Sequence, residues 1–336
     1  MTTTAVVILN YNGASFLQQF LPTVLKHSPE AEVIVADNCS TDGSLAYMQT
    51  AHPGVRVIAL DRNYGFCGGY NRALAQVEAD YFVLLNSDIE VTAGWLQPMI
   101  SLLDGDVLIQ ALQPKILSYK ERGRFEYAGA AGGFIDRLGY PFCRGRLFAY
   151  AEEDRGQYND VREIFWATGA CLMIRAGVYR QQGGLDEDFF AHMEEIDLCW
   201  KINRAGGKVY YCGQSTVYHV GAGTLSYGSP RKTYLNFRNG LTMLLKHYDG
   251  WELVLKLPFR LVLDWVAANV FILQGQFGQA WAIWRAHLDF AGSAGRTWRK
   301  RRKIVTAYPA YSREHVYKGL IIADYYLRRK RAISGL

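Results

Sequence analysis

Short apolar runs alternate with helix-like segments along the first hundred residues. Four such runs are rich in Val, Ile, Leu and aromatic residues, and a polar cluster follows each of them. They are residues 5–9, 32–36, 55–60 and 81–85. Continuous apolar runs of this length indicate strands that are covered on both faces. Strands that alternate with helices form βαβ units, so the pattern predicts an α/β fold whose Rossmann-like, mostly parallel sheet has helices on both faces.

The segments between these runs have the features of helices. Residues 14–26 have helical periodicity, and residues 45–49 follow a loop that is rich in helix-capping residues. A third helix is expected from Tyr70 to Glu78. Because the carboxyl ends of parallel strands meet at one edge of a sheet, the polar clusters are expected to converge there, where α/β proteins bind ligands.

The fourth apolar run leads directly into the cluster Asn86-Ser87-Asp88-Ile89-Glu90. Its two carboxylates are two residues apart at the expected end of a strand. Oxygen-rich clusters at such a position suit a hard divalent cation that also holds substrate phosphates. The alternative is a strand end whose acids are simply solvated, and this stretch alone supports both interpretations equally.

Two common nucleotide-binding classes lack their signatures in this chain. A dinucleotide-binding oxidoreductase needs Gly-x-Gly-x-x-Gly directly after the first strand. Residues 10–14 read Asn-Tyr-Asn-Gly-Ala instead, and Gly65, Gly68 and Gly69 have the wrong spacing. The Walker phosphate loop is also missing, so both classes are disfavoured.

The middle of the chain is less regular. A helix is expected at residues 95–103. Further strands are expected near residues 108–113, 163–166, 170–174, 208–211 and 215–218. Residues 118–160 are rich in Gly, Tyr, Phe and Arg and lack a strong period, which is typical of a long functional loop. We interpret this segment as a loop on the acceptor side of a site.

Three acids, Glu194, Glu195 and Asp197, stand at the start of an expected helix. Acids are favoured near a helix N-terminus, so the plain interpretation is a well-charged helix start. The apolar lead-in at residues 189–191 suggests instead that the acids face a partly buried site. A carboxylate held there can act as a general base toward an acceptor hydroxyl.

His219 follows the last of these expected strands and precedes a glycine-containing segment, residues 220–224. A lone histidine after a strand is more often structural than a ligand. The glycines nevertheless allow the backbone to approach a ligand closely, and an imidazole suits Mn²⁺ better than Ca²⁺.

Composition narrows the possibilities further. Half of the residues are apolar, so disorder is not indicated. The six cysteines are scattered without a Cys-x-x-Cys pair, which disfavours a zinc or redox motif and suits a reducing compartment. The N-terminus lacks the basic region and cleavage site of a signal peptide.

Positive charge is concentrated at the C-terminus. From Arg296 onward twelve Lys or Arg face only Glu314 and Asp324, a net charge of +10, while residues 1–295 carry −4 of the total of +6. Such asymmetry indicates a polyanionic partner for the tail. Nucleic acid lacks support because the chain has no recognition motif for it, which leaves an anionic membrane surface.

The region before this tail is apolar and rich in tryptophan. Residues 257–274 are too short for a membrane span and contain Arg260 and Asp264, an i,i+4 pair on one helical face. An amphipathic helix is expected, either packed on the preceding domain or lying in a membrane interface. A second helix contains Trp281 and Trp284, and its aromatic residues either bind the membrane or form a core beneath a solvated basic face.

Six motifs together resemble those of inverting family 2 glycosyltransferases of the GT-A fold, close to the rhamnosyltransferase-like branch. The motifs are Val7–Asn12, Ala36–Asp42, Asn63–Asn71, Leu84–Asp88, Met193–Cys199 and His219–Gly221. Each motif alone is weak, whereas six in the family's order across roughly 240 residues form a strong signal.

The resemblance implies a set of nucleotide-binding residues. Asp37 resembles the acid that accepts a hydrogen bond from the pyrimidine base of the donor, and Asn86 would lie near the ribose. The full expected set is Asn10, Asp37, Arg62, Asn63, Asn71 and Asn86.

The resemblance also implies a metal site and a base. The triplet 86–88 resembles an Asp-x-Asp motif with Asn in place of its first acid, so Asp88 would bind Mn²⁺ or Mg²⁺, with His219 as a further ligand. Glu195 resembles the catalytic base of the family's Glu-Asp pair. Because the pair here is Glu194-Glu195, Glu194 remains the alternative base.

The function implied is that of a metal-dependent, inverting glycosyltransferase using dTDP-rhamnose or a similar donor. Its acceptor would be a lipid-linked glycan for cell-surface polysaccharide, at the cytoplasmic, inner face of the membrane. Residues 1–250 would form the catalytic domain, and residues 251–336 a helical, basic, membrane-associating extension. The alternative is a non-catalytic nucleotide- or carbohydrate-binding protein that retains the fold. The oligomeric state stays open.

Overall fold

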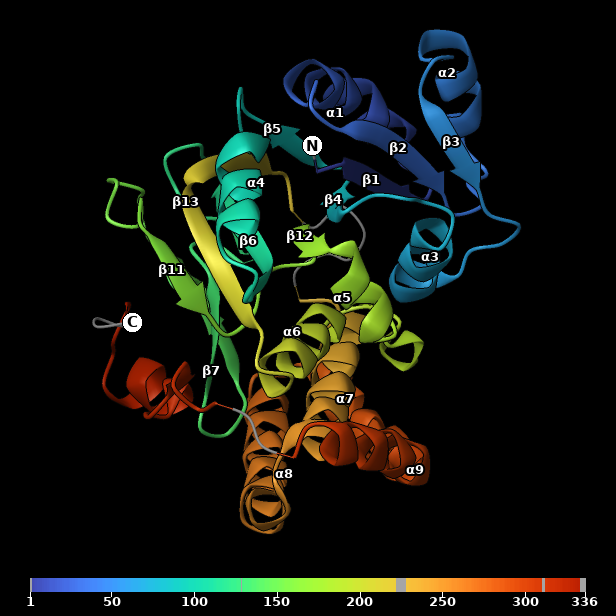
Figure 1. The fold of residues 1–336 in the computed structure, drawn as a ribbon. Helices are drawn as coiled ribbons and strands as arrows, with labels where there is room; N and C mark the ends of the chain where they lie inside the picture. Colours follow the sequence, from blue (N-terminus) through green and yellow to red (C-terminus); the bar gives the residue numbers. More distant parts are fainter. Residues whose placement is uncertain (1, 128, 222–227, 310–311, 333–336) are drawn as a thin grey trace.

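The computed structural model describes residues 2–127, 129–221, 228–309 and 312–332. Figure 1 shows a large central sheet with helices packed against it and a group of three helices at one end. These three are α7 (Pro230–His247), α8 (Gly250–Leu273) and α9 (Phe277–Ala307).

The main sheet has nine strands within the described residues. They are β1 Thr4–Asn10, β2 Glu32–Asp37, β3 Arg56–Ala59, β4 Tyr81–Asn86, β5 Ile89–Val91, β6 Ile109–Ser118, β11 Val161–Ile164, β12 Cys171–Arg175 and β13 Lys208–His219. Their order is β11-β13-β6-β12-β4-β1-β2-β3, with β5 on β13. The first four strands pair in parallel, as predicted. β12 is antiparallel to both β4 and β6, so it interrupts the parallel order.

Helices cover both faces of this sheet, which confirms the predicted α/β fold. Successive residues of β1 point to opposite faces: Val6 and Ile8 join one apolar core, and Ala5 and Val7 join the other. The first core includes residues of α1 (Ala14–His27), α2 (Ser44–Ala51) and α4 (Leu96–Gly105). The second includes residues of α3 (Gly65–Leu74), α5 (Ala176–Gln181) and α6 (Glu194–Arg204).

A second, smaller sheet occupies the segment predicted to be irregular. Its strands are β7 Gly133–Asp136, β8 Pro141–Cys143, β9 Arg146–Leu147, β10 Tyr150–Ala151 and β14 Val316–Tyr317. The prediction of one irregular loop is therefore wrong for much of residues 133–151. These strands have two to four residues each, too few to establish a period. β14 pairs with β7, so the C-terminal extension contributes a strand as well as helices.

Two predicted elements have different bounds in the structure. α3 begins at Gly65 instead of Tyr70, since its glycines allow close packing: a Cβ on Gly69 would lie 2.8 Å from Leu9. The two strands expected in residues 208–218 form the single strand β13, with a register shift after Cys212. A Cβ on Gly213 would lie only 2.5 Å from a backbone oxygen, so glycine permits this close approach.

The C-terminal helices are longer than predicted. Asp249 and Glu252 form a capping box, so α8 begins at Gly250 and contains Pro258 within its length. α9 packs along both α7 and α8. Of the helices that the structure describes, none combines the length and apolarity that a membrane crossing requires.

Candidate active site

The carboxyl ends of β1, β2 and β4 bring several predicted nucleotide-binding residues together. The strand register pairs Asn10 with Asp37 and sets Asn86 beside Leu9. Asn10 Nδ2 donates a hydrogen bond to Asp37 Oδ2 at 3.0 Å, and the Ser40 backbone N–H donates to Oδ1 at 2.8 Å. Asn10 and Asp37 are both buried, so the Asp37 carboxylate has a fixed orientation as an acceptor.

Arg62 and Asn63 lie in the exposed turn that follows β3. Asn63 Oδ1 accepts hydrogen bonds from Asn38 Nδ2 at 3.0 Å and from the Gly65 backbone N–H at 2.8 Å. The Arg62 guanidinium lies 4.7 Å from the centre of the Tyr64 ring. The turn is therefore ordered by its own polar contacts and extends the edge of the sheet formed by β1 and β2.

Asn71 occupies a different setting from the other predicted nucleotide residues. Its Oδ1 accepts hydrogen bonds from Tyr179 Oη at 2.7 Å and from the Leu185 backbone N–H at 3.0 Å. Its Nδ2 donates to the Leu185 carbonyl at 2.8 Å. Both ends of the amide are thus engaged within the protein. Asn71 thus anchors the Leu185 backbone, and its expected contact with the nucleotide stays a prediction.

Asp88 and His219, the predicted metal ligands, are neighbours although 131 residues separate them in the sequence. His219 Nε2 lies 3.2 Å from Asp88 Oδ1, and its Nδ1 lies 3.0 Å from Glu126 Oε2. All three residues are buried. Burial lowers the pKa of His219, but the charge of Asp88, followed by Glu126, raises it to about 10. Beyond His219, the predicted glycine-containing exit falls partly on residues 222–227, which lie outside the described residues.

The chemistry of Asp88 and His219 fits a hard divalent cation. No group of three or more His, Cys, Asp or Glu forms a complete ligand set among the residues that the structure describes. Mg²⁺ keeps several waters and is commonly held by one or two carboxylates together with substrate phosphates, and Mn²⁺ accepts oxygen and imidazole ligands. One carboxylate and one imidazole therefore suit an open site, with Glu126 as the outer partner that orients the imidazole.

Helix α6 begins with two acids, Glu194 and Glu195. Phe190, His192 and Met193, which precede it, have positive φ angles of 66°, 68° and 74°, a conformation that costs roughly 1–3 kcal/mol per residue. The Oε2 atoms of Glu194 and Glu195 are buried and receive no hydrogen bond from the described residues. Burial raises the pKa of Glu195 to about 7 and that of Glu194 well above its usual range. Such carboxylates can accept protons near neutral pH.

Glu195 lies close to the end of β4. A Cβ on Gly169 would be 3.7 Å from Glu195 Cβ, and the next residue, Ala170, accepts a hydrogen bond from the Asn86 backbone N–H at 2.9 Å. Glu195 is also half-buried, whereas Glu194 is buried. The first turn of α6 therefore places Glu195, the more accessible acid, close to the segment that is hydrogen-bonded to Asn86.

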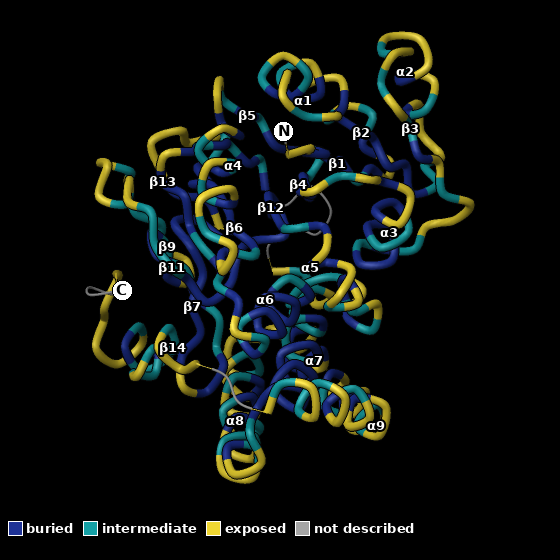
Figure 2. Tube along the Cα trace, viewed as in Figure 1, coloured by how far each residue is buried: buried dark blue, intermediate teal, exposed yellow. Residues whose placement is uncertain are grey.

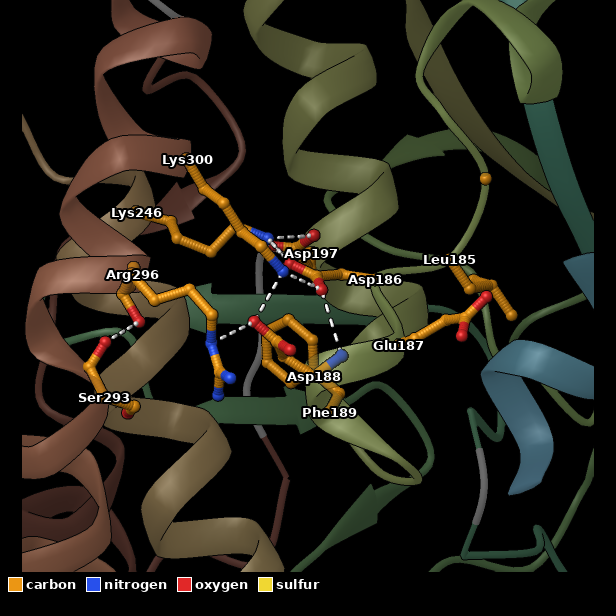
Figure 3. Close-up of polar contacts among 12 residues, drawn as sticks. Leu185, Asp186, Glu187, Asp188, Phe189, Asp197, Lys246, Ser293, Arg296 and Lys300 are labelled. Carbon is orange, nitrogen blue, oxygen red and sulfur yellow. Dashed lines mark hydrogen bonds and ion pairs between the residues drawn. The ribbon is translucent and has the colours of Figure 1, made fainter. Parts of the chain in front are cut away.

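Asp197, in the same turn of α6, belongs to a network with Lys246 (Figure 3). Lys246 Nζ donates to Asp197 Oδ2 and to Asp186 Oδ2, both at 2.7 Å. His247 Nε2 lies 2.8 Å from Asp197 Oδ1. Burial would raise the pKa of Asp197, but Lys246 and His247 hold it well below its usual range. Asp197 is thus a structural acid that attaches α6 to α7.

The same network reaches α9. Asp188 lies in the short helix η1 (Glu187–Phe189) just before α6, and it pairs with Arg296 at 2.9 Å and with Lys300 at 2.6 Å. A cavity of about 730 Å³ opens between Asp188, α7 and α9. None of the described predicted site residues lines this cavity. The candidate active site is instead at the end of β4, where polar groups converge and the pKa of Glu195 is raised.

Sequence reasoning missed three residues that the structure places around the site. Glu126 lies in the segment that was expected to be a loop, and nothing local links it to His219. Lys246 and His247 offered a signal, because two basic residues directly follow the apolar pair Leu244-Leu245. Buried charges of this kind require partners.

The strand-end group and the adjacent buried carboxylate are the features of a GT-A glycosyltransferase. In agreement, the sequence profile described as "Glycosyl transferase family 2" matches residues 5–181, more than half of the chain. The chain belongs to glycosyl transferase family 2 and is a glycosyltransferase.

Relatives and structural neighbours agree with this assignment. The N-acetylglucosaminyl-diphospho-decaprenol L-rhamnosyltransferase of Mycobacterium tuberculosis is 25% identical over 329 residues, covering 89% of this chain and 97% of the relative. The low-salt glycan biosynthesis hexosyltransferase Agl10 of Haloferax volcanii is 22% identical, covering 80% and 88%. The S. aureus TarS 1–349 complex with UDP-GlcNAc has a TM-score of 0.53 at 17% identity, covering 91% of both chains. The Pyrobaculum calidifontis mannosyltransferase PcManGT with GDP-Man and Mn²⁺ has a TM-score of 0.52 at 13% identity, covering 91% and 86%.

Proposed function

We propose that the protein is a metal-dependent, inverting glycosyltransferase that transfers a sugar from a nucleotide donor to a hydroxyl of a lipid-linked glycan in cell-surface polysaccharide synthesis. The similarity to the mycobacterial rhamnosyltransferase, over nearly the full length of both chains, supports this acceptor class. The same similarity favours dTDP-rhamnose or a related donor. A lipid-linked acceptor sets the reaction at the inner face of the cell membrane.

Donor recognition is assigned to the ends of β1, β2 and β4. Asp37 is oriented by Asn10 and still has acceptor capacity, because a carboxylate offers about four lone-pair sites. It accepts a hydrogen bond from the N–H of a pyrimidine base. Arg62 and Asn63 contact the nucleotide from their exposed turn, and Asn86 lies near the ribose.

Asp88 and His219 would hold the divalent cation, Mn²⁺ or Mg²⁺. When bound, it would supply Lewis-acid stabilisation of the negative charge on the departing diphosphate. Glu126 fixes the orientation of the His219 ring through the contact at Nδ1. Asn71 supports the site indirectly, by anchoring Leu185 ahead of the short helix η1.

Glu195 is the proposed catalytic base. It takes the proton from the acceptor hydroxyl while that oxygen forms a bond to the anomeric carbon of the sugar. The bond between this carbon and the diphosphate breaks, and the electron pair leaves with the diphosphate. Attack from the side opposite the leaving group inverts the configuration. The Glu195 carboxylate beside the end of β4, whose Oε2 atom is buried without a described hydrogen-bond partner and whose pKa is raised by burial to about 7, is the observation that carries this proposal.

A panel of donors tests the function directly. The protein is incubated with dTDP-rhamnose, UDP-GlcNAc or GDP-mannose, an N-acetylglucosaminyl-diphospho-lipid acceptor, and Mn²⁺, Mg²⁺ or chelator. We expect acceptor-dependent release of one nucleoside diphosphate, lost with chelator. Donor binding without sugar transfer across the panel would overturn the proposal and favour a binding protein.

A further inference from the structure

Helix α8 turns charged side chains inward and many of its large apolar side chains outward. Arg260 and Asp264 are only 5% and 1% exposed, and Glu252 is also buried. Val254 and Leu273, in contrast, are 72% and 86% exposed. A helix on the surface of a globular protein normally buries its apolar face. Leu253, Leu257 and Leu261 do pack inward, so α8 has apolar residues on both sides, and the outer apolar side is left uncovered in the structure.

The outward residues form a continuous stripe along α8. Its main members are Trp251, Leu255, Phe259, Val262, Val266, Val270 and Leu273, and the exposed Trp265 precedes Val266. Their spacing of three or four residues keeps them on one side of the helix for most of its 24 residues, about 36 Å at the usual rise. Figure 2 shows exposed positions along both α8 and α9. Exposed apolar residues need an explanation when they are contiguous rather than scattered.

Polar contacts fix the inner face of α8 in place. Arg260 Nε lies 2.9 Å from Asp264 Oδ1, and His287 of α9 lies 3.3 Å from Asp264 Oδ2. The Arg260 guanidinium stacks 3.6 Å from the centre of the Tyr140 ring. Rotating α8 to bury the apolar stripe would move Arg260 and Asp264 away from Tyr140 and His287. Removing buried charges from their partners carries a large free-energy penalty. The outward orientation is thus a built feature.

Helix α9 adds exposed aromatic residues in its first turns and exposed cations in its second half. Phe277 and Trp281, exposed in its first turns, follow directly after Leu273. In its second half the exposed residues include the cations Arg299, Arg302 and Lys303. An apolar surface with aromatic residues and neighbouring cations matches the interface of an anionic bilayer, where aromatic rings lie at headgroup depth and cations meet lipid phosphates.

We propose that the outer face of α8, continued by the first turns of α9, binds the surface of an anionic membrane and lies at the boundary between headgroups and acyl chains. A second copy of the chain fits this face less well. A two-fold contact would bring identical surfaces together and would set the cations of α9 near their own copies.

Membrane binding would also orient the catalytic residues. Lys300 and Arg296 of α9 pair with Asp188, which lies directly before the helix that holds Glu195 (Figure 3). The membrane-binding face and the proposed base therefore belong to one connected structure, and a lipid-linked acceptor would reach the base from the bilayer. This consequence rests on the proposed function, whereas membrane binding itself does not.

Vesicle flotation without substrates tests the surface. The probes are vesicles of phosphatidylcholine, with or without phosphatidylglycerol. The variant Phe259→Ser/Trp265→Ser removes two outward side chains, and Val107→Ser/Leu108→Ser is the matched control, since these exposed apolar residues lie between α4 and β6. We expect the α8 variant to lower the partition coefficient at least roughly tenfold and the control to leave it unchanged. Both variants should unfold at the wild-type temperature.

Charge substitutions separate the two parts of the surface. Arg302→Gln and Lys303→Gln should each reduce binding to anionic vesicles about fivefold and leave binding to neutral vesicles unchanged. Three results would overturn the proposal: wild-type protein that does not float with anionic vesicles, an α8 variant that floats like wild type, or dimers in light scattering that the α8 variant dissociates.

Activity assays with two acceptors test the membrane-binding surface and the proposed function separately. On a short-chain, water-soluble acceptor the α8 variant should keep wild-type turnover, while turnover of a vesicle-embedded acceptor should fall with binding. Vesicle binding without turnover of any donor would contradict the proposed function alone. Turnover without vesicle binding would contradict the membrane surface alone.

Discussion

The first turn of helix α6 holds acids in opposite states. The Oε2 atoms of Glu194 and Glu195 are buried without a described hydrogen-bond partner, and burial raises the pKa of Glu195 to about 7. Toward α7, Asp197 lies against Lys246 and His247, and its pKa is held well below its usual range. Both sites are buried, so the difference comes from the neighbouring cation that only Asp197 has.

The difference in pairing distinguishes an acid that stabilises the fold from an acid that can take part in the reaction. An acid that is paired with a buried lysine is locked in its ionised form and links two helices. An acid without a partner destabilises the fold but remains able to take a proton. The strained residues before α6 and the network behind it hold the unpartnered pair in position, as expected of a site built on a rigid support.

Replacing Glu195 should have the largest effect on turnover. Glu195→Gln removes the proposed proton acceptor, and we expect kcat to fall ~10²–10⁴-fold, the usual loss for a general base. The affinity for the nucleotide sugar, measured by calorimetry, should stay near wild type. The matched variant is Glu194→Gln. If Glu194→Gln costs more turnover than Glu195→Gln, the base is Glu194.

Replacing Asp197 should affect the fold instead. Asp197→Asn leaves Lys246 without one of its two buried carboxylates, and we expect a loss of roughly 3–5 kcal/mol in the free energy of unfolding, measured with urea. The surface ion pair of Glu78 with Arg180 provides the control. Glu78→Gln should change stability by less than about 1 kcal/mol. Equal effects of both variants would contradict the supporting role of Asp197.

Replacing Glu126 tests a third acid, which contacts a histidine in place of a lysine. Glu126→Gln loosens the orientation of His219, and we expect the affinity for Mn²⁺ in the presence of nucleoside diphosphate to fall about 10–100-fold. Glu90→Gln is the matched control. Glu90 lies in β5, pairs with Arg122 at 2.8 Å and has no assigned metal role. A larger loss with Glu90→Gln would move the metal site to Glu90.

The pH dependence of stability should show the smallest effect. The pKa of Glu195 rises from an ordinary value of 4.5 to about 7 on folding, so between these values the folded state binds more protons than the unfolded state. Stability therefore falls as pH increases from about 4.5 to about 7, by about 1–3 kcal/mol, and is unaffected by this group below pH 4.5. Thermal unfolding of Glu195→Gln should lack this loss. Wild-type kcat/KM should increase through pH 7, and a profile that decreases there would contradict a base of this pKa.

Much of the N-terminal half could be predicted from the sequence. Residues 5–9, 32–36 and 81–85 are strands because buried strands require continuous apolar runs, and the turn residues after them are polar. Asn10 and Asp37 could be placed together because parallel pairing aligns strand ends. The contact between Asp88 and His219 was predicted only through the family resemblance, since no local pattern connects residues that far apart.

The chain beyond β6 was harder to predict because its order depends on distant partners. The strands of residues 133–151 are too short to show a period, and β14 from the C-terminus completes their sheet. Glu126 belongs to the same segment. Asp197 could not be distinguished from Glu194 and Glu195 by sequence, since Lys246 and His247, which set its state, follow about fifty residues later.

By itself the sequence determined that strands and helices alternate, that polar groups follow the strands, and that Arg260 and Asp264 share one face of a helix. Those features depend on local periodicity. Only the tertiary structure decided which acids have partners and which face of α8 is turned outward. Both depend on which elements pack together, because the pKa of a carboxylate and the direction of a helix face are set by neighbours that the local sequence does not contain.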